Sequence, residues 1–356
     1  MATIYDVAKV AGVSPKTVSR VVNGDAPVGE KTRAKVEAAI RSLEYVPSSA
    51  ARMMRSNRSG LIGVITGAIA RTAELSDPKG LPDLFIVQGI QQIIAQQDLT
   101  LMIADTGGSF EKVPSLIRTF QQYRVEGLIY VADYHKQVAF DPVPQGCPLV
   151  LANCYDASGT PAVVPDDQSC QKSLVERLIA HGHRRIGYLT LDQDMLATPL
   201  RVAGYRDALQ AAGVEFDPEL VATGYKMTDG PSHEWLGAAL DRMLALPNRP
   251  SVICCGNDEM AMRLYGLLRT RGIRVPEEIS VAGFDNYRTI AETLYPSLST
   301  VELPYAEMGR RSAELLLSLI SEEAPPPHDP VRVPGGVFWR SSVIDLEPDR
   351  QTSKGG

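Results

Sequence analysis

Residues 12–24 read GVSPKTVSRVVNG, and this stretch decides how the first part of the chain folds. Ser14 is a residue type that caps helix N-termini, and Pro15 stands at the first helical position, where no backbone hydrogen bond is lost. Valines at positions 18, 21 and 22 then give the helix one apolar face. The other face carries hydroxyl, amide and cationic groups but no acidic one, and its members are Lys16, Ser19, Arg20 and Asn23. Such groups suit phosphate oxygens and base edges in a DNA major groove, with a merely solvated helix face as the alternative.

The stretch belongs to a predicted group of three short helices over residues 3–45. The first has apolar residues at helical spacing from Ile4 and ends at Gly12, and the third is expected from about Glu30 to Leu43. The valine face of the middle helix is expected to pack on the first helix, as in a helix-turn-helix. The basic linker that follows, YVPSSAARMMRSNRSG, has room for only about two turns of helix, which are marginal without a partner.

Charge is distributed unevenly along the chain. Residues 1–60 hold ten Lys and Arg against five Asp and Glu, a net charge of +5, whereas the remaining residues carry −11. A small basic head on a large acidic body is typical of a polyanion-binding module joined to a second unit, although chance clustering is the alternative.

From Leu61 onward, apolar runs alternate with amphipathic stretches. Strands are predicted at 61–66, 99–105, 127–132, 148–153, 185–191, 251–258 and 279–285. Helices are predicted near 84–97, 111–123, 168–181, 200–212, 232–246, 257–271 and 304–320. This alternation predicts parallel sheets covered on both faces, and seven strands suit two α/β lobes better than one. Ligands in such sheets bind beyond the carboxyl ends of the strands, so we expect a cleft between the lobes.

Several function classes are disfavoured by the sequence. No run of 18 or more apolar residues appears, so no membrane span is expected, and the N-terminus lacks the features of a secretory signal. The five cysteines (147, 154, 170, 254 and 255) lack metal-like spacing, so we expect reduced thiols in a cytoplasmic protein without a metal site or cofactor. No Gly-rich dinucleotide turn, P-loop or G-x-S-x-G motif supports an enzyme.

The sequence resembles the lactose/galactose repressor family over almost its full length. The segment TIYDVAKVAGVSPKTVSRVVNG resembles that family's helix-turn-helix and is the most diagnostic part. The segments HGHRRIGYL, RVAGYRDAL, GNDEMA, RGIRVPEEISVAGFDN, YPSLSTVELPYAEMGRRSAELLL and VFWRSS match its regulatory domain in order. The regulatory-domain matches alone would also fit periplasmic sugar-binding proteins, which share that fold.

The resemblance implies a domain organisation. We expect a small all-α helix-turn-helix head at 1–46, a hinge helix and linker at 47–60, and a two-lobed α/β effector-binding and dimerisation domain of the periplasmic-binding-protein type at 61–345. Lobe 1 is expected at about 61–160 and 294–324, and lobe 2 at about 161–293 and 325–345. Residues 346–356 form a tail without leucine heptads, which favours a dimer over a tetramer built by the tail.

The resemblance also implies DNA contacts. The family's base-reading positions correspond to Pro15, Lys16 and Arg20 of this chain. The family's phosphate-contacting positions correspond to Thr3, Tyr5, Ser14, Thr17, Ser19 and Asn23. Because proline cannot read a base by hydrogen bonding, direct readout is expected to depend on Lys16 and Arg20, both suited to guanine. In the hinge, Ala51 and Met54 match the minor-groove positions, with Met54 as the apolar wedge where the family usually has leucine.

The expected effector contacts, also implied by the resemblance, are Arg201, Asn257 and Asp285. Arg donates and Asp accepts charge-assisted hydrogen bonds, so these two residue types can bind neighbouring hydroxyl groups of a sugar. Taken singly, Asn257 also suits a helix cap, Asp285 a turn and Arg201 a surface cation. Weaker candidates are Phe85, Asn153, Asp166 and Tyr225. Two departures stand out: Asn153 replaces the commoner Asp, and the loop over 67–84 is longer than the family's.

The sequence therefore predicts a DNA-binding transcriptional regulator, most simply a repressor. Two protomers would bind a pseudo-palindromic operator, and a small carbohydrate-like effector between the lobes would control operator affinity. A regulator with a non-sugar corepressor and a sugar-binding protein without a DNA role are the alternatives.

Overall fold

The computed structural model describes residues 2–24, 27–46, 58–67, 82–139, 147–226, 233–323 and 325–346. The side chains at positions 82, 83, 233 and 234 are not described. The expected minor-groove residues Ala51 and Met54, most of the long loop over 67–84 and the tail from 347 lie outside these ranges. No helix of the described residues is long and apolar enough to cross a membrane.

The head consists of three helices, as the sequence predicts: α1 (Ile4–Ala11), α2 (Pro15–Asn23) and α3 (Glu30–Ser42). Gly12 follows α1 with a φ of 65°, a left-handed conformation that glycine adopts at no steric cost. Gly29 precedes α3 without a side-chain cap. The helices bury one small apolar core, made of Val7, Ala8, Ala11, Val18, Val36 and Ala39.

Lobe 1 is a six-stranded, fully parallel sheet in the order β11-β5-β4-β3-β1-β2. Its strands are β1 (Leu61–Thr66), β2 (Thr100–Asp105), β3 (Gly127–Val138), β4 (Leu149–Asp156), β5 (Ala162–Pro165) and β11 (Val331–Val333). Helices α5 (Pro82–Ile94) and α12 (Tyr305–Ile320) cover one face, and α6 (Val113–Gln122) covers the other. A Cβ atom at Gly89 or Gly309 would overlap the backbone of the facing helix, so these glycines let α5 and α12 pack closely.

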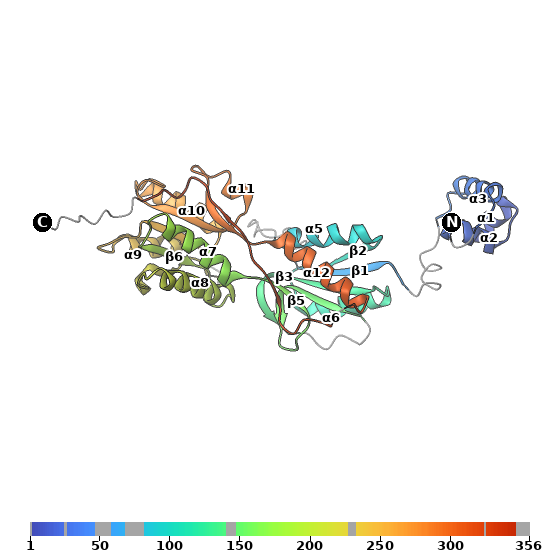
Figure 1. Ribbon diagram of the computed structural model, residues 1–356, viewed down its shortest axis with the longest axis horizontal. Coiled ribbons are helices and arrows are strands. Elements are labelled where there is room, and N and C mark those ends of the chain that lie inside the picture. The colour runs from blue at the N-terminus through green and yellow to red at the C-terminus, as the bar shows by residue number, and fades with distance from the viewer. Residues whose placement is uncertain are drawn as a thin grey trace.

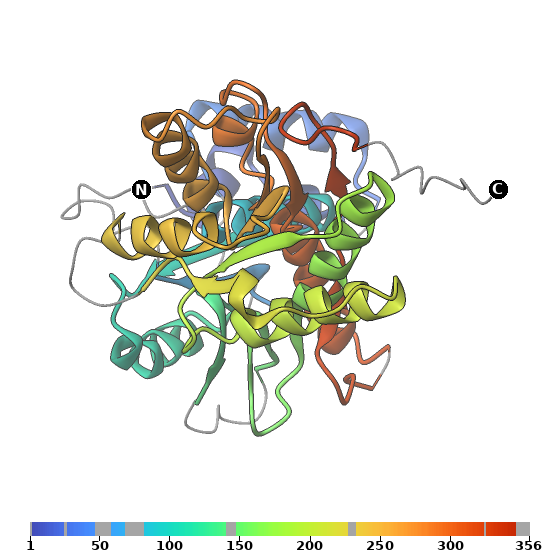
Figure 2. The ribbon, with the colours of Figure 1, turned by 90° about the vertical axis from the view of Figure 1, so that its left-hand side faces the viewer.

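Lobe 2 is a second six-stranded sheet, in the order β12-β10-β9-β8-β6-β7. Its strands are β6 (Ile186–Thr190), β7 (Val221–Thr223), β8 (Val252–Cys255), β9 (Ser280–Asp285), β10 (Ser299–Glu302) and the antiparallel β12 (Val337–Phe338). Helices α7 (Asp167–Ala180) and α8 (Ala197–Ala211) pack on one face, with α9 (His233–Leu244) and α10 (Asp258–Thr270) on the other. The short α11 (Arg288–Ala291) follows β9. Figure 2 looks onto this lobe and shows the two helical layers around its sheet.

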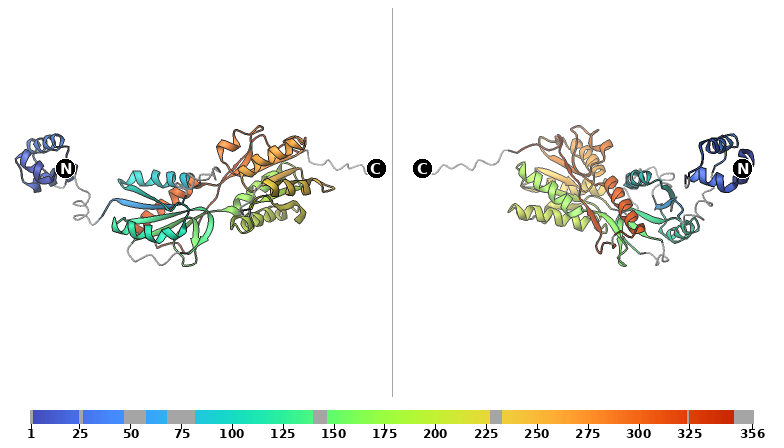
Figure 3. Two further views of the ribbon diagram at one scale, coloured as in Figure 1. Left: turned by 180° about the vertical axis from the view of Figure 1, so that it is seen from behind. Right: turned by 45° about the vertical axis from the view of Figure 1, so that its right-hand side comes forward.

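The two lobes lie side by side, and the chain passes between them three times (Figures 1 and 3). The crossings follow β5, β10 and β11. Our expected lobe boundaries were therefore wrong at three points: β5 and β11 belong to lobe 1, and β10 belongs to lobe 2. The cause is strand pairing, because β10 pairs with β9 and β11 pairs with β5, and no local sequence pattern reports these long-range partners.

All seven predicted strands and all seven predicted body helices are present. Five strands were not predicted from the sequence, and each has only two to four residues: β5, β7, β10, β11 and β12. Strands this short give too few positions to establish a period.

Candidate DNA-binding face and ligand cavity

The polar face of α2 is open to solvent. Lys16 and Arg20 are exposed, and in the described part of the chain their side chains form no hydrogen bond or ion pair. Val18 on the opposite face is fully buried in the core of the head. The helix thus holds two uncommitted cations on a rigid surface, the arrangement that DNA readout requires.

Most of the expected phosphate contacts also stabilise the head itself. The Ser14 hydroxyl accepts a hydrogen bond from the Thr17 amide at 3.2 Å and lies 3.0 Å from the Thr17 hydroxyl. The Asn23 amide donates to the Ser19 carbonyl at 2.7 Å. Thr3 caps α1, and its hydroxyl donates to the Asp6 carboxylate at 2.7 Å. These bonds fix the hydroxyl and amide groups around α2, and their DNA contacts stay a prediction.

Tyr5, another of the expected phosphate contacts, is strongly exposed. The residue is 71% exposed although it lies within α1. Its phenolic hydroxyl is therefore accessible for the expected phosphate contact, which stays a prediction.

A cavity of about 1080 Å³ lies where the two lobes meet. It opens at the carboxyl ends of β8, β9 and β10, where ligands of parallel sheets bind. Three expected effector residues line it: Phe85 from α5 of lobe 1, and Asn257 and Asp285 from lobe 2. The cavity therefore combines an aromatic wall with hydrogen-bonding groups on the opposite side.

Asn257 both caps a helix and faces the cavity. Its carbonyl oxygen accepts a hydrogen bond from the Met260 amide at 2.7 Å, which confirms the helix-cap interpretation. In the described part of the chain its amide nitrogen has no hydrogen bond, so this group can donate to a ligand.

Asp285 ends β9 in an unusual backbone conformation. Its φ is 120°, and that of Asn286 is 52°, a region that costs on the order of 1–3 kcal/mol for residues other than glycine. Within the described residues the Asp285 carboxylate has no hydrogen-bond partner, and it lines the cavity. Burial and the nearby carboxyl of Asp258 raise its pKa well above the usual value. Because a raised pKa favours the protonated form, this unpaired carboxyl group can donate a hydrogen bond to a ligand hydroxyl as well as accept one.

Asp258, in contrast, is committed to the protein. Its carboxylate accepts hydrogen bonds from the Thr300 hydroxyl at 2.6 Å and from the Tyr287 amide at 2.7 Å. Burial raises the pKa of Asp258 to about 7 despite these bonds. Asp258 thereby ties α10 to β10 and to the loop after β9, and it holds the wall of the cavity in place.

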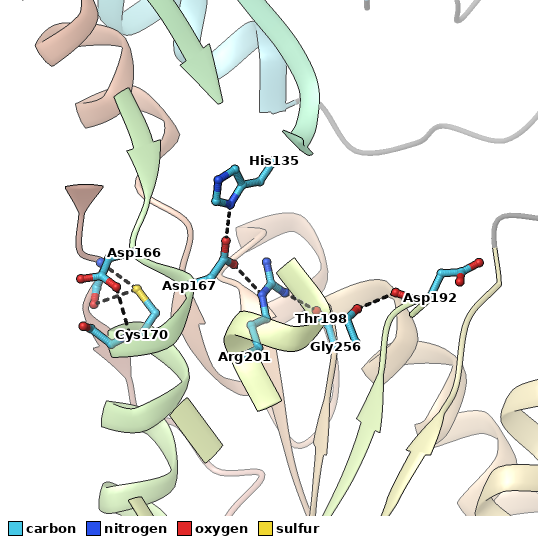
Figure 4. Close-up of polar contacts among 10 residues, drawn as sticks. His135, Asp166, Asp167, Cys170, Asp192, Thr198, Arg201 and Gly256 are labelled. Atoms are coloured by element: carbon cyan, nitrogen blue, oxygen red, sulfur yellow. Dashed lines mark hydrogen bonds and ion pairs between the residues drawn. The ribbon is translucent and has the colours of Figure 1, made fainter. Parts of the chain in front are cut away.

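Arg201 lies behind the cavity instead of lining it. The residue is 4% exposed, and its Nε donates to the Asp167 carboxylate at 2.6 Å (Figure 4). Its Nη1 donates to the Gly256 carbonyl at 2.6 Å, and its Cζ lies 3.6 Å from the centre of the Phe284 ring. Gly256 and Phe284 directly precede Asn257 and Asp285, so Arg201 supports the backbone of both cavity residues.

Comparison with known proteins shows which family the chain belongs to. Residues 3–48 match the model of the lacI family of bacterial regulatory proteins, and residues 175–343 match the periplasmic binding protein-like domain. The chain is 31% identical over 326 residues to the HTH-type transcriptional repressor PurR of Vibrio atlanticus, covering 91% of this chain and 93% of that relative. This protein belongs to the lacI family.

Solved structures agree with this assignment. The lac repressor dimer bound to operator and the anti-inducer ONPF superposes with a TM-score of 0.76 at 25% identity, covering 96% of this chain and 99% of that one. The complex of the transcriptional regulator CelR with cellobiose superposes with a TM-score of 0.62 at 29% identity, covering 96% and 100%. The lacI-family protein is thus a DNA-binding transcriptional regulator with a ligand-binding body.

Of the weaker effector candidates of this lacI-family protein, Phe85 lines the cavity, whereas Asn153, Asp166 and Tyr225 lie outside its lining. Asn153 is buried and donates to the Ala132 carbonyl at 3.0 Å. Asp166 caps α7 by accepting from the Ser169 amide at 3.1 Å, and Tyr225 packs against the core of lobe 2. Their contact with an effector stays a prediction.

Sequence reasoning missed three residues at the lobe boundary: Asp258, Asp167 and His135. The pair of aspartates at 166–167 was a signal, since we selected only the first of them, and the second is the one that binds Arg201. His135 gave no signal, because its partner Asp167 lies 32 residues away. Within the described residues, no group of three or more His, Cys, Asp or Glu side chains is placed to hold a metal ion.

Proposed function

We propose that this lacI-family protein is a repressor that binds a pseudo-palindromic operator as a homodimer and is controlled by a carbohydrate-like effector in the cavity at the lobe boundary. Its role is regulatory and not catalytic, and it acts in the cytoplasm, where the chromosome lies. The lac repressor neighbour is a dimer bound to operator, which supports the homodimer.

The unpaired carboxylate of Asp285 is the observation that carries the effector proposal. It faces a cavity that also offers the Asn257 amide, and Phe85 stands on the other lobe. Hydroxyl-rich ligands match this set, because carboxylate and amide groups bond hydroxyls while an aromatic ring packs on the apolar face of a sugar. The cellobiose bound to CelR supports the same ligand class. A non-sugar corepressor is the second candidate.

A thermal-shift screen tests this proposal. Neutral sugars, sugar acids and nucleobases are added to the full chain, and we expect a sugar to raise the Tm. A ligand present at a concentration of about 100 times its Kd adds about 2.7 kcal/mol to the free energy of unfolding. Asp285→Asn should abolish the shift, whereas Asp241→Asn, an exposed aspartate of α9, should retain it. A shift caused only by nucleobases, or a sugar shift unchanged by Asp285→Asn, contradicts the proposed effector site.

A further inference from the structure

One buried carboxylate joins the two lobes. Asp167, the first residue of α7, is 1% exposed and lies at the first crossing between the lobes. Its Oδ2 is 2.7 Å from Nδ1 of His135 on β3 of lobe 1, and its Oδ1 accepts from Nε of Arg201 on α8 of lobe 2 (Figure 4). His135 and Arg201 are themselves only 8% and 4% exposed.

The surroundings of Asp167 favour its ionised form. Burial alone raises its pKa, but the Arg201 guanidinium and the His135 ring outweigh burial and hold the pKa below its usual value. A buried carboxylate that loses one of its partners is strongly destabilised, so the three groups hold one another in position. A movement of the lobes that separates His135 from Asp167 is therefore unfavourable in free energy.

The first turn of α7 is also hydrogen-bonded to a second segment that passes between the lobes. The Asp166 amide donates to the Val333 carbonyl at 3.0 Å, and the Gly335 amide donates to the Cys170 sulfur at 3.1 Å. Two of the three segments that connect the lobes thus meet at the first turn of this helix. Asp167 is at the point where a change in the lobe arrangement must be accommodated.

The network reaches the cavity through Arg201. Its guanidinium bonds the Gly256 carbonyl and stacks on Phe284, the residues before Asn257 and Asp285. The contacts are therefore continuous from lobe 1, through His135, Asp167 and Arg201, to the two polar residues that face the cavity. A chain of packed and hydrogen-bonded groups of this kind can carry coupling between sites.

We propose that His135, acting through Asp167, is a positioning residue that sets the place of Arg201 and so makes the cavity residues Asn257 and Asp285 depend on the arrangement of the two lobes. This inference deepens the proposed effector site by naming the contact that links ligand binding to lobe movement. His135 does not line the cavity and acts only through its partner.

Hydrogen exchange measured by mass spectrometry on the full chain tests the proposal, without operator or sugar. His135→Leu removes the Nδ1 group, and we expect peptides covering 166–171, 255–260 and 283–288 to exchange about tenfold faster than in the wild type. Peptides covering β1 should be unchanged. His135→Asn places an amide donor at the position of Nδ1, so its exchange should stay close to the wild type. His328→Leu, on an exposed histidine, is the matched control.

The pattern of exchange separates positioning from ordinary packing. Faster exchange confined to 127–139, or an equal increase in every peptide, overturns the proposal, as does equal behaviour of His135→Asn and His135→Leu. If His135→Leu does not fold, His135→Gln replaces it, because its amide nitrogen corresponds to Nε2 and not to Nδ1. The exchange experiment uses no sugar, so it can be interpreted even if the sugar screen finds no ligand. The two proposals can therefore fail independently.

Discussion

Two arginines of this lacI-family protein occupy opposite environments. Arg20 on α2 is exposed and has no side-chain bond in the described part of the head, whereas Arg201 on α8 is buried and makes two hydrogen bonds and a ring contact. The first side chain is available to a partner molecule, and the second is already used by the protein. We infer that the head recognises its partner through surface groups that make no bonds within the protein. In the body, buried groups such as Arg201 hold the residues that face the cavity in position.

This contrast changes what a mutation reports. Replacement of Arg20 removes a side chain that we expect to contact DNA and that makes no bond within the described head. Replacement of Arg201 first removes the partner of Asp167, so a lost effector response would partly reflect a damaged body. The cavity residue Asp285, whose carboxyl group has no hydrogen-bond partner among the described residues, is the cleaner test of ligand binding.

The largest predicted effect is on stability at Arg201. Arg201→Met should lower the free energy of unfolding by about 3–5 kcal/mol, because it leaves the Asp167 carboxylate buried without its main cation. Urea unfolding of the full chain measures this. Arg274→Met, on an exposed arginine paired with Glu278, should change stability by less than about 1 kcal/mol. Equal small losses in both variants would show that the buried network does not stabilise the body.

The second prediction concerns recognition by Arg20. The operator is first obtained by selection of random DNA with the wild-type chain. Arg20→Ala should then weaken operator binding about 100-fold or more, because each of two heads loses a base contact of about 1–3 kcal/mol. The Tm should not change. Arg41→Ala, on the exposed last turn of α3, should bind within a few-fold of the wild type. Equal loss on operator and random DNA would indicate a phosphate contact and not base reading.

The head could be predicted from the sequence because its signals are local. Ser14, Pro15 and Gly12 mark helix ends within a few residues of where they act, and the valines set the buried face. The long strands of the body were found for the same reason. In contrast, the lobe assignment of β10 and the His135–Asp167 contact depend on residues far apart in sequence, and no local pattern encodes them.

The expected effector residues differ in where the structure places them. Asn257 and Asp285 were reached by family resemblance and do line a cavity. The same resemblance placed Arg201 among the effector contacts; the structure buries it next to two residues of the cavity wall, and its contact with an effector stays a prediction. Burial of a side chain depends on all the neighbours that pack around it, so the position of Arg201 in the sequence did not predict its burial.

The smallest predicted effect is a pH dependence that arises in the body. Burial raises the pKa of Asp258 to about 7 from an ordinary 3.8, and the pKa of Asp285 is raised as well. At pH values between the unfolded and the folded pKa, each carboxyl group stays protonated in the folded protein but is ionised in the unfolded chain. The contribution of the two groups to the free energy of unfolding therefore falls as the pH rises. His183 has the opposite effect. Burial lowers its pKa below 6.5, so in acid the unfolded chain binds a proton at this residue more readily than the folded protein does, and stability falls as the pH falls.

A difference measurement isolates the two carboxyl groups from His183. Asp285→Asn removes one of them, so it should gain on the order of 1 kcal/mol relative to the wild type between pH 5 and pH 8. Urea unfolding at both pH values measures this gain. Asp241→Asn should show no such change, because Arg271 lowers the pKa of Asp241 and this exposed carboxylate is already ionised at pH 5. A constant difference between Asp285→Asn and the wild type would mean that Asp285 is ionised in the folded state throughout this range. The cavity would then present a permanent negative charge, which favours a cationic ligand over a neutral sugar.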